Sequence, residues 1–359
     1  MLVLIGKKLQ ISTLKYLLTS NNMLKAGIIG LGKMGISHAA IVGPHRDAEL
    51  VAVCDTSSLI LDAFKKFTSI NVYSDYKKMM DTEKLDCVVV ATPTRFHYPI
   101  VKYSLEKGIH TFCEKPFSLT TKQGEELVRL ANQKWLVNQV GYHNHFIGTF
   151  NELKRLLKAG VIGELVHFTG EAYGPVVTKE KGGTWRSAPE EGGGCLFDYA
   201  SHVINLIQEI IGRPVKVKGT LFKRIYSKEV EDAVYSMLTL ESGLSGILSV
   251  NWSDETYRKM STSLTLLGKK GKIICDATEI KIYLKEAALK ENLNKGWTIK
   301  YNTEFAIPVN FYLRGEEYSA QIDNFISCIL NKKQTEINSF DQALYTDKVI
   351  ELIIADSKS

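Results

Sequence analysis

The feature that most constrains the fold is a regular alternation of short apolar runs with longer amphipathic segments, from Leu24 to about Val140. The apolar runs lie at 25–30, 49–54, 86–91, 109–113 and 135–140, and segments with helical spacing lie at 33–43, 57–67, 97–107 and 120–133. Runs that are apolar almost throughout are typical of strands buried on both faces of a parallel sheet. Because strands alternate with helices, the sequence predicts right-handed βαβ units and a doubly wound α/β sheet.

The second part of the chain has a different texture. A helical segment at 150–160 is followed by period-two alternation at 164–173, 214–225, 231–241, 244–252, 259–268 and 271–284, and two further helices are expected at 312–330 and 341–355. This pattern predicts an α/β domain with a large open, mostly antiparallel sheet. We therefore expect a Rossmann domain at 23–141 and a substrate-binding and oligomerisation domain at 142–359, whose C-terminal helices can pack back on the first.

Composition and charge exclude several classes of protein. The 359 residues carry a net charge of +6 without any block of lysine and arginine, so nucleic-acid binding is not expected. No stretch reaches the roughly 18 apolar residues that a membrane span needs. Six scattered cysteines without a CxxC pair argue against a disulfide framework or a zinc site, and they fit the cytoplasm.

The first 22 residues are mildly apolar but interrupted by lysines. They lack an apolar core followed by a small-residue cleavage site, so we do not expect a secretory signal. We interpret 1–22 as an N-terminal extension, either an appendage from an upstream start or a peripheral helix.

A glycine-rich turn joins the first expected strand to the first expected helix. It consists of Gly30, Leu31, Gly32, Lys33, Met34 and Gly35. In a GxGxxG turn the first glycine permits the tight turn, the second lets a pyrophosphate approach the backbone, and the third allows close packing of helix and strand. The amides at the helix N-terminus then face the phosphates. We therefore expect a dinucleotide to bind residues 30–35.

Two further strand ends are expected to contact the cofactor. Asp55 stands 20 residues beyond Gly35, where a carboxylate accepts hydrogen bonds from the ribose hydroxyls and repels a 2′-phosphate, so NAD is favoured over NADP. Thr92 and Pro93 follow the run at 86–91 and should flank the cofactor. His97 either contacts the cofactor as well, or caps or packs against the next helix.

Two segments carry candidate catalytic residues. Glu114 and Lys115 follow the run at 109–113, where Lys115 can stabilise negative charge on a reacting oxygen; the alternative is a surface lysine in a turn. Three glycines at 192–194 precede Asp198 and His202, which share one face if this segment is a helix. His202 is then suited to exchange a proton and Asp198 to orient it or to bind a substrate hydroxyl. The alternative is a capping aspartate and a structural histidine.

These motifs together resemble the Gfo/Idh/MocA oxidoreductase family, from about Leu24 to the C-terminus. The resemblance implies that Lys115, Asp198 and His202 bind substrate and handle the proton, and we expect Glu114 and Lys115 also to contact the cofactor. It also implies a homodimer or homotetramer, for which we expect the C-terminal sheet to provide the interface. Two departures concern the substrate: the segment 141–146 lacks the arginine that many members have, and Asn205 replaces an acidic residue.

Other residues are candidates for contact with the substrate. Trp185 can stack on a sugar ring and Arg186 can bind a carboxylate or phosphate, although an interface tryptophan and a surface arginine are equally ordinary. His143 and Tyr173 are weaker candidates. No compact set of metal ligands is present, so no metal is expected.

The expected function is reversible, NAD-dependent oxidation of a ring alcohol in a sugar, nucleotide sugar or cyclic polyol. Two alternatives stay open at this point. One is an NAD-dependent glycoside hydrolase that oxidises its substrate transiently, and the other is an NAD-binding regulatory protein without activity.

Overall fold

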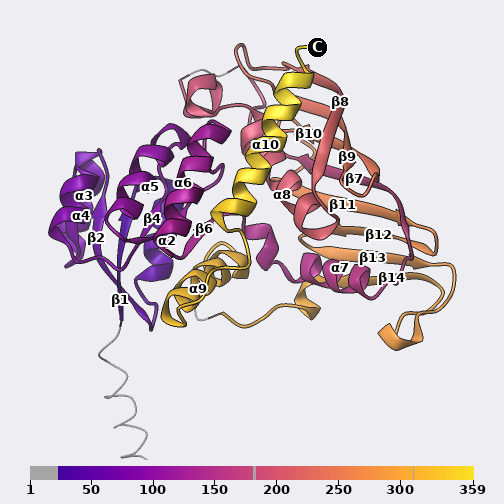
Figure 1. The fold of residues 1–359 in the computed structure, drawn as a ribbon, viewed down its shortest axis with the longest axis horizontal. Coiled ribbons are helices and arrows are strands. Elements are labelled where there is room, and N and C mark those ends of the chain that lie inside the picture. Colours follow the sequence, from indigo (N-terminus) through magenta and orange to yellow (C-terminus); the bar gives the residue numbers. More distant parts are fainter. Residues whose placement is uncertain (1–22, 181–182, 310) are drawn as a thin grey trace, which may run out of the picture.

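The computed structural model describes residues 23–180, 183–309 and 311–359. They form two sheets with their helices, side by side, and the C-terminal helix runs along the seam between them (Figure 1). The expected extension at 1–22 lies outside the described residues.

The first sheet confirms the doubly wound α/β prediction. Its six parallel strands lie in the order β3 (Asn71–Tyr73), β2 (Ala48–Cys54), β1 (Leu24–Ile29), β4 (Cys87–Val90), β5 (His110–Cys113) and β6 (Asn138–Val140). The helices are α2 (Lys33–Val42), α3 (Ser58–Phe67), α4 (Tyr76–Thr82), α5 (His97–Glu106) and α6 (Thr121–Gln133). The sequence patterns above did not include β3 and α4, because a three-residue edge strand with no buried position has no apolar run.

Both faces of this sheet are buried. Val88 and Val90 share a core with α5 and α6, whereas Cys87 and Val89 face the opposite core beside α2. Four residues of α9 (Glu316–Leu330) complete that second core: Ile322, Phe325, Ile326 and Ile329. Since successive side chains of a strand point to opposite faces, burial on both faces requires the continuous apolar runs seen in the sequence.

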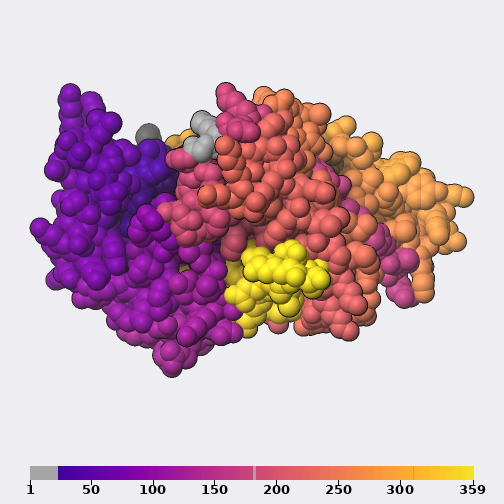
Figure 2. All heavy atoms as spheres, turned by 90° about the horizontal axis from the view of Figure 1, so that it is seen from above, coloured from indigo at the N-terminus to yellow at the C-terminus, as the bar shows by residue number. Residues whose placement is uncertain are grey.

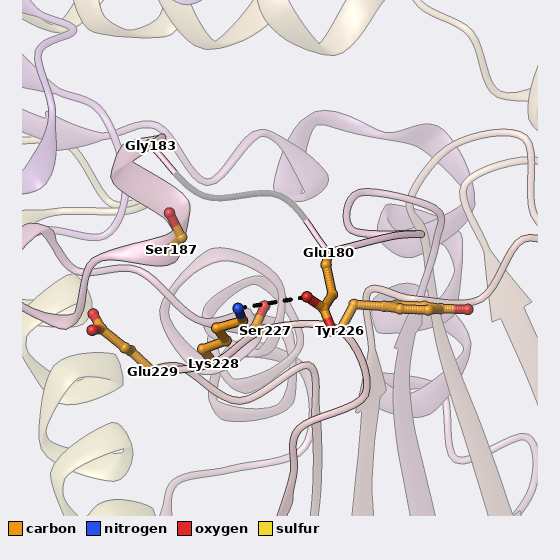
Figure 3. Close-up of a pocket in the computed structure, with 7 residues that line it drawn as sticks. All are labelled: Glu180, Gly183, Ser187, Tyr226, Ser227, Lys228 and Glu229. Atoms are coloured by element: carbon orange, nitrogen blue, oxygen red, sulfur yellow. Dashed lines mark ion pairs between the residues drawn. The ribbon is translucent and has the colours of Figure 1, made fainter.

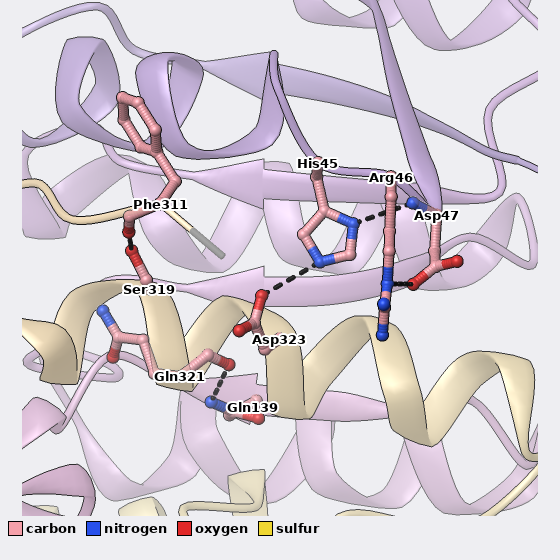
Figure 4. Close-up of polar contacts among 8 residues, drawn as sticks. All are labelled: His45, Arg46, Asp47, Gln139, Phe311, Ser319, Gln321 and Asp323. Atoms are coloured by element: carbon pink, nitrogen blue, oxygen red, sulfur yellow. Dashed lines mark hydrogen bonds and ion pairs between the residues drawn. The ribbon is translucent and has the colours of Figure 1, made fainter. Parts of the chain in front are cut away.

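Polar contacts also hold α9 against the first domain (Figure 4). His45 Nε2 lies 3.0 Å from Asp323 Oδ1, and Gln139 Nε2 donates to the carbonyl oxygen of Gln321 over 2.9 Å. A segment from the end of the chain is therefore part of the structure around the first sheet.

The second sheet is mostly antiparallel, as predicted. Its eight strands lie in the order β14 (Gly296–Tyr301), β13 (Glu279–Leu284), β12 (Gly271–Asp276), β11 (Ser261–Gly268), β7 (Leu165–Tyr173), β10 (Ser245–Asn251), β9 (Ala233–Leu240) and β8 (Pro214–Lys223). Its parallel pair is β7 with β10. The single strand expected at 271–284 is a hairpin, because Asp276 Oδ1 accepts hydrogen bonds from the amides of Thr278 and Glu279 and turns the chain. No pattern predicted β14.

Helices cover one face of this second sheet and leave the other open. Leu238 and Leu248 are buried in the core that the sheet forms with α7 (Gly148–Lys158) and α8 (Ser201–Ile210). Their neighbours Met237 and Ile247 are exposed by 57% and 43%. This alternation explains the period-two pattern of the sequence.

Helix α10 (Phe340–Asp356) joins the two parts. Phe340 and Leu344 belong to the core of the first sheet, whereas Val349 and Ile350 belong to that of the second. Figure 2 shows α10 at the junction of the two parts. The carboxyl end of β5, where Lys115 follows, meets the second domain at this seam.

Candidate functional site

The glycine turn has the shape that a dinucleotide needs. Gly30 has φ +88°, and a Cβ atom on Gly35 would lie 1.7 Å from the carbonyl oxygen of Gly30. By contrast, no atom lies within 4 Å of a Cβ built on Gly32. Gly32 also begins α2 without a side-chain cap hydrogen bond, so a cap does not satisfy the first amides of the helix. The turn thus offers an open cradle, with Lys33 and Met34 on the first helical turn beside it.

Asp55 lies next to this turn. Its Oδ2 accepts a hydrogen bond from the amide of Leu31 over 2.5 Å, and its Oδ1 accepts one from the amide of Ser57 over 2.8 Å. A carboxylate has about four acceptor positions, so two amides leave capacity for ribose hydroxyls. The side chain is partly exposed at the carboxyl end of β2.

The turn after β4 contains one residue suited to the cofactor and one that is not. Thr92 Oγ1 is buried without a hydrogen-bond partner, as a polar atom that faces a ligand would be. His97 is only 1% exposed, and its ring nitrogens each lie 2.9 Å from a carbonyl oxygen, those of Thr92 and Pro116. Burial lowers the pKa of His97. His97 therefore lies between the turns that follow β4 and β5 and donates to one of the two carbonyl oxygens, which supports the alternative that it packs there over a contact with the cofactor.

Glu114 is also buried, at 8% exposure, with Oε1 2.7 Å from His38 Nε2. Burial acts to raise its pKa, but the hydrogen bond and charge of His38 outweigh burial and lower the pKa. The carboxylate abuts Gly141, where a Cβ would approach Oε2 to 2.9 Å. Glu114 thus packs strand β5 against α2 and β6.

Lys115 reaches across the seam to the second domain. Its Nζ donates hydrogen bonds to Asp198 Oδ1 over 2.5 Å and to the Asp198 carbonyl oxygen over 2.9 Å. Arg186 Nε donates to the other carboxylate oxygen, Oδ2, over 2.9 Å. Burial alone would raise the pKa of Asp198, but the two cations outweigh it and hold the pKa below its usual value. The carboxylate is therefore ionised between two positive charges.

The segment that carries Asp198 is not a regular α-helix. Residues Leu196–Ala200 form a π-helical turn that continues into α8. Both oxygens of Asp198 are occupied by Lys115 and Arg186, and no hydrogen bond joins Asp198 to His202 among the described residues. The contacts therefore give no support to the alternative in which Asp198 orients His202, and the alternative in which Asp198 binds a substrate hydroxyl stays a prediction.

His202 is 3% exposed and lies among aromatic rings. Its ring centroid is 5.0 Å from that of His143 and 5.8 Å from that of Tyr142, both edge-on. Its Nδ1 is buried without a partner. Burial, and after it the positive charge of Lys115, lower the pKa of His202 well below its usual value. The imidazole is therefore neutral at neutral pH.

His143 connects this group to α9. Its ring stacks on Tyr318 at 4.7 Å, and the guanidinium of Arg314 lies 5.3 Å from the Tyr318 ring centroid. Burial lowers the pKa of His143 to about 4. Its neighbour His145 contacts Asn205, with Nε2 2.5 Å from Oδ1. The sequence predicted that the C-terminal helices can pack back on the first domain, but Tyr318 and Arg314 were not predicted, since no motif near them marks which side chains face the site.

Two other substrate candidates lie in different places. Phe168, Gly170 and Ala172 of β7 are buried, and a Cβ on Gly170 would meet α8. By alternation Tyr173 points to the opposite, open face, where its hydroxyl lies 2.6 Å from Ser249 Oγ. Tyr173 is thus separated from His202 by the sheet, and we withdraw it.

Trp185 lies in a surface hollow of about 430 Å³, which is also lined by Pro93, Arg95 and Glu191. A second hollow of about 420 Å³ shares Gly183, Ser187 and Glu229 with it (Figure 3). Lys115, Asp198 and His202 line neither hollow. Trp185 stacks on Arg186, with the guanidinium 4.5 Å from the indole centroid, so the tryptophan is connected to Asp198 through Arg186.

The described part of the chain contains neither a metal-binding cluster nor a membrane-spanning helix. It contains no group of three or more His, Cys, Asp or Glu side chains arranged to hold a metal ion. Likewise, none of its helices combines the length and apolar character of a membrane span. All six cysteines are unpaired.

Two protein-family models match the chain. Residues 24–142 match an oxidoreductase family with an NAD-binding Rossmann fold, and residues 150–274 match the GFO/IDH/MocA C-terminal domain. The first sheet and the glycine turn described above therefore form an NAD-binding Rossmann domain.

Relatives of known name and solved structures agree with these matches. D-glucoside 3-dehydrogenase of Escherichia coli (strain K12) is 29% identical over 66% of this chain and 71% of its own length. The scyllo-inositol 2-dehydrogenase (NADP(+)) of Bacillus subtilis (strain 168) is 24% identical over 61% and 60%. Levoglucosan dehydrogenase in complex with NADH has the same fold, with a TM-score of 0.83 and 19% identity over 93% of this chain and 97% of that one.

Proposed function

Because the chain belongs to the Gfo/Idh/MocA oxidoreductase family, we propose that it is an NAD-dependent dehydrogenase acting on a ring CH–OH group of a sugar, nucleotide sugar or cyclic polyol. NAD supplies the hydride acceptor or donor when bound. The printed names of two relatives, a glucoside dehydrogenase and an inositol dehydrogenase, support a substrate of this class. The observation that carries the proposal is the Lys115 ammonium group, held across the seam by Asp198.

Lys115 is suited to bind the reacting oxygen. An ammonium group has three N–H donors, and Asp198 accepts two of them. We assign the third to the substrate oxygen, where the positive charge stabilises the alkoxide that develops as the C–H bond breaks. Asp198 and Arg186 keep the ammonium group in place, so Asp198 acts on Lys115.

His202 is suited to take the hydroxyl proton. It is neutral because burial and Lys115 lower its pKa, so a ring nitrogen has a lone pair available. Its Nδ1 is sealed in the protein, and we therefore assign the proton transfer to Nε2. His143, Trp185 and Arg186 are kept as candidates for contact with the rest of the substrate.

Asp55 supports NAD as the preferred cofactor. Its carboxylate lies beside the glycine turn with acceptor capacity left for ribose hydroxyls, and it would repel a 2′-phosphate. Since one relative is named for NADP(+), the preference is a point to be measured.

We also propose that the open face of the second sheet is a subunit interface of a homodimer or homotetramer. Met237 and Ile247 are paired across β9 and β10, and Leu221, Leu267 and Trp297 are likewise exposed by 43% to 57%. Exposed large apolar side chains on one open sheet face support an interaction site there. Light scattering of the parent and of Met237→Glu tests this, because a charge there should dissociate the assembly; an unchanged mass would refute the assignment.

A screen of free polyols, sugar acids, glycosides and nucleotide sugars with NAD and NADP tests the function. We expect NADH absorbance to rise with at least one sugar or polyol, in stoichiometric amounts. Release of a free sugar from a glycoside without net NADH would replace the proposal with hydrolysis by transient oxidation. Tight NADH binding without turnover of any compound would leave a binding protein.

A further inference from the structure

Asp347 of α10 is a buried carboxyl group without a role in the proposed reaction. It is 3% exposed, and its Oδ2 accepts hydrogen bonds from the amide of Ser118 over 3.0 Å and from the Ser118 hydroxyl over 2.9 Å. Its Oδ1 is buried without a partner. Burial of a carboxyl group costs free energy of folding. Both hydrogen bonds to Asp347 come from Ser118, which is 229 positions away, so the cost of burial is offset at this one contact.

Ser118 stands three residues after Lys115, in the segment between β5 and α6. The ring of the intervening Phe117 packs on Phe340 at the start of α10, with centroids 4.5 Å apart. Helix α10 therefore holds the backbone directly after Lys115 through one apolar and one polar contact.

A second carboxylate provides a natural comparison. Glu351, one turn further along α10, accepts hydrogen bonds from the amide and the hydroxyl of Thr121 over 2.8 and 2.9 Å. The donors are of the same kind, but Glu351 is exposed and Thr121 is twice as far from Lys115 in the sequence. The two contacts differ in burial and in distance from the site.

We propose that Asp347 is a positioning residue for Lys115, which it holds through Ser118. The backbone after Lys115 is fixed to α10, and the ammonium group is fixed to Asp198. The third N–H of the ammonium group therefore keeps pointing toward the position that we assign to the substrate oxygen. This inference rests on the proposed dehydrogenase, and it adds the C-terminal helix to the parts that build the reaction centre.

The ionisation of Asp347 adds a signature in pH. Burial raises the pKa of Asp347 to about 8, against the hydrogen bonds from Ser118, and the charge of Glu351 raises it further. The other titratable groups near it are also acids, since Asp347 in turn raises the pKa values of Tyr142 and Cys113. At neutral pH the carboxyl group is therefore protonated. Above pH 8 it places a charge without a counterion in the seam.

The first test compares Asp347→Ala, Asp347→Asn and Glu351→Ala by steady-state kinetics on the sugar found in the screen. We expect Asp347→Ala to lower kcat about 10- to 100-fold with little change in KM for NAD, because a small displacement of a catalytic group has effects of this size. Asp347→Asn still accepts from Ser118 and should restore kcat to within about threefold. Glu351→Ala should leave kcat unchanged.

The pH profile distinguishes positioning from general stabilisation. The activity of the parent should fall above about pH 8. The activity of Asp347→Asn should not show this alkaline fall, because an amide does not ionise. Equal losses of kcat in Asp347→Ala and Glu351→Ala would overturn the proposal. The same fall of activity above about pH 8 in Asp347→Asn as in the parent would also overturn it. Should Asp347→Ala fail to fold, the Asp347→Asn profile and a smaller kcat loss in Ser118→Ala decide it.

A readout that needs no substrate separates this inference from the proposed function. Acetic anhydride labels lysines according to their accessibility, and mass spectrometry gives the rate for Lys115 relative to the other lysines. Faster labelling of Lys115 in Asp347→Ala, but not in Glu351→Ala, supports the positioning role even if no sugar is turned over. Unchanged labelling would refute it even in an active dehydrogenase.

Discussion

The two halves of the candidate site are built in opposite ways. The cofactor half uses residues close together in the chain, since Leu31 and Asp55 are 24 positions apart and the glycine turn spans six residues. The Lys115 half joins residues 83 positions apart at Asp198 and 229 apart at Asp347. A local pattern therefore reveals the first half, whereas the second depends on how two sheets and α10 pack. Mutations in the first half should therefore change cofactor binding, and mutations in the second half should change the rate of the reaction.

The largest expected effect separates chemistry from cofactor binding. Lys115→Ala should lower kcat by about 10²- to 10³-fold, the usual cost of losing a donor to a developing oxyanion. The NADH dissociation constant, measured by fluorescence, should change by less than about threefold. Lys102→Ala is the matched control, because it removes a lysine whose ion pair with Glu126 joins α5 to α6 and does not involve Asp198. Full activity in Lys115→Ala would remove the residue from the mechanism.

The opposite result is expected from Gly32→Ala. The methyl group meets no atom of the described residues within 4 Å apart from its chain neighbours, so the melting temperature should fall only slightly, by the cost of alanine at an N-cap. It would occupy the space that a pyrophosphate approaches, and NADH affinity should fall about 10-fold or more. If NADH binds Gly32→Ala as tightly as the parent, the pyrophosphate does not lie on this turn.

A smaller effect is expected on the preference of the cofactor half for NAD over NADP. Asp55→Asn keeps an acceptor for Leu31 but removes the negative charge, so the preference for NAD over NADP should fall by about tenfold. The ratio of kcat/KM for the two cofactors measures this. An unchanged ratio would show that other groups select the cofactor.

The smallest effect concerns the buried imidazoles of the second half. Burial depresses the pKa of His143 to about 4, so between pH 4 and pH 6.5 the unfolded chain binds the extra proton. The free energy of unfolding should therefore fall as pH drops through this range. In His143→Phe, which retains a ring to stack on Tyr318, the loss between pH 7 and pH 5.5 should be smaller by about 1 kcal/mol. Urea denaturation at several pH values measures it, and parallel curves would contradict the assignment.

The sequence predicted the parts of the site that follow directly from a strand end. Gly30, Asp55, Thr92 and Lys115 each stand where a parallel strand stops, and such ends share one edge of the sheet. It left open whether His97 contacts the cofactor or packs, and it gave no direction for the Tyr173 side chain. The two carbonyl oxygens beside His97 come from separate turns, and the helices that pack on the second sheet decide which face of β7 is covered.

The sequence by itself determined the two fold classes and the glycine turn, because periodicity and backbone freedom are properties of adjacent residues. Tertiary structure alone decided that Asp198 pairs with Lys115 and Arg186, that Tyr318 stacks on His143, and that Asp347 reaches Ser118. These contacts form between elements that are distant in the sequence. Packing of the two sheets and α10 decides which polar groups are buried next to one another, and therefore which of them pair.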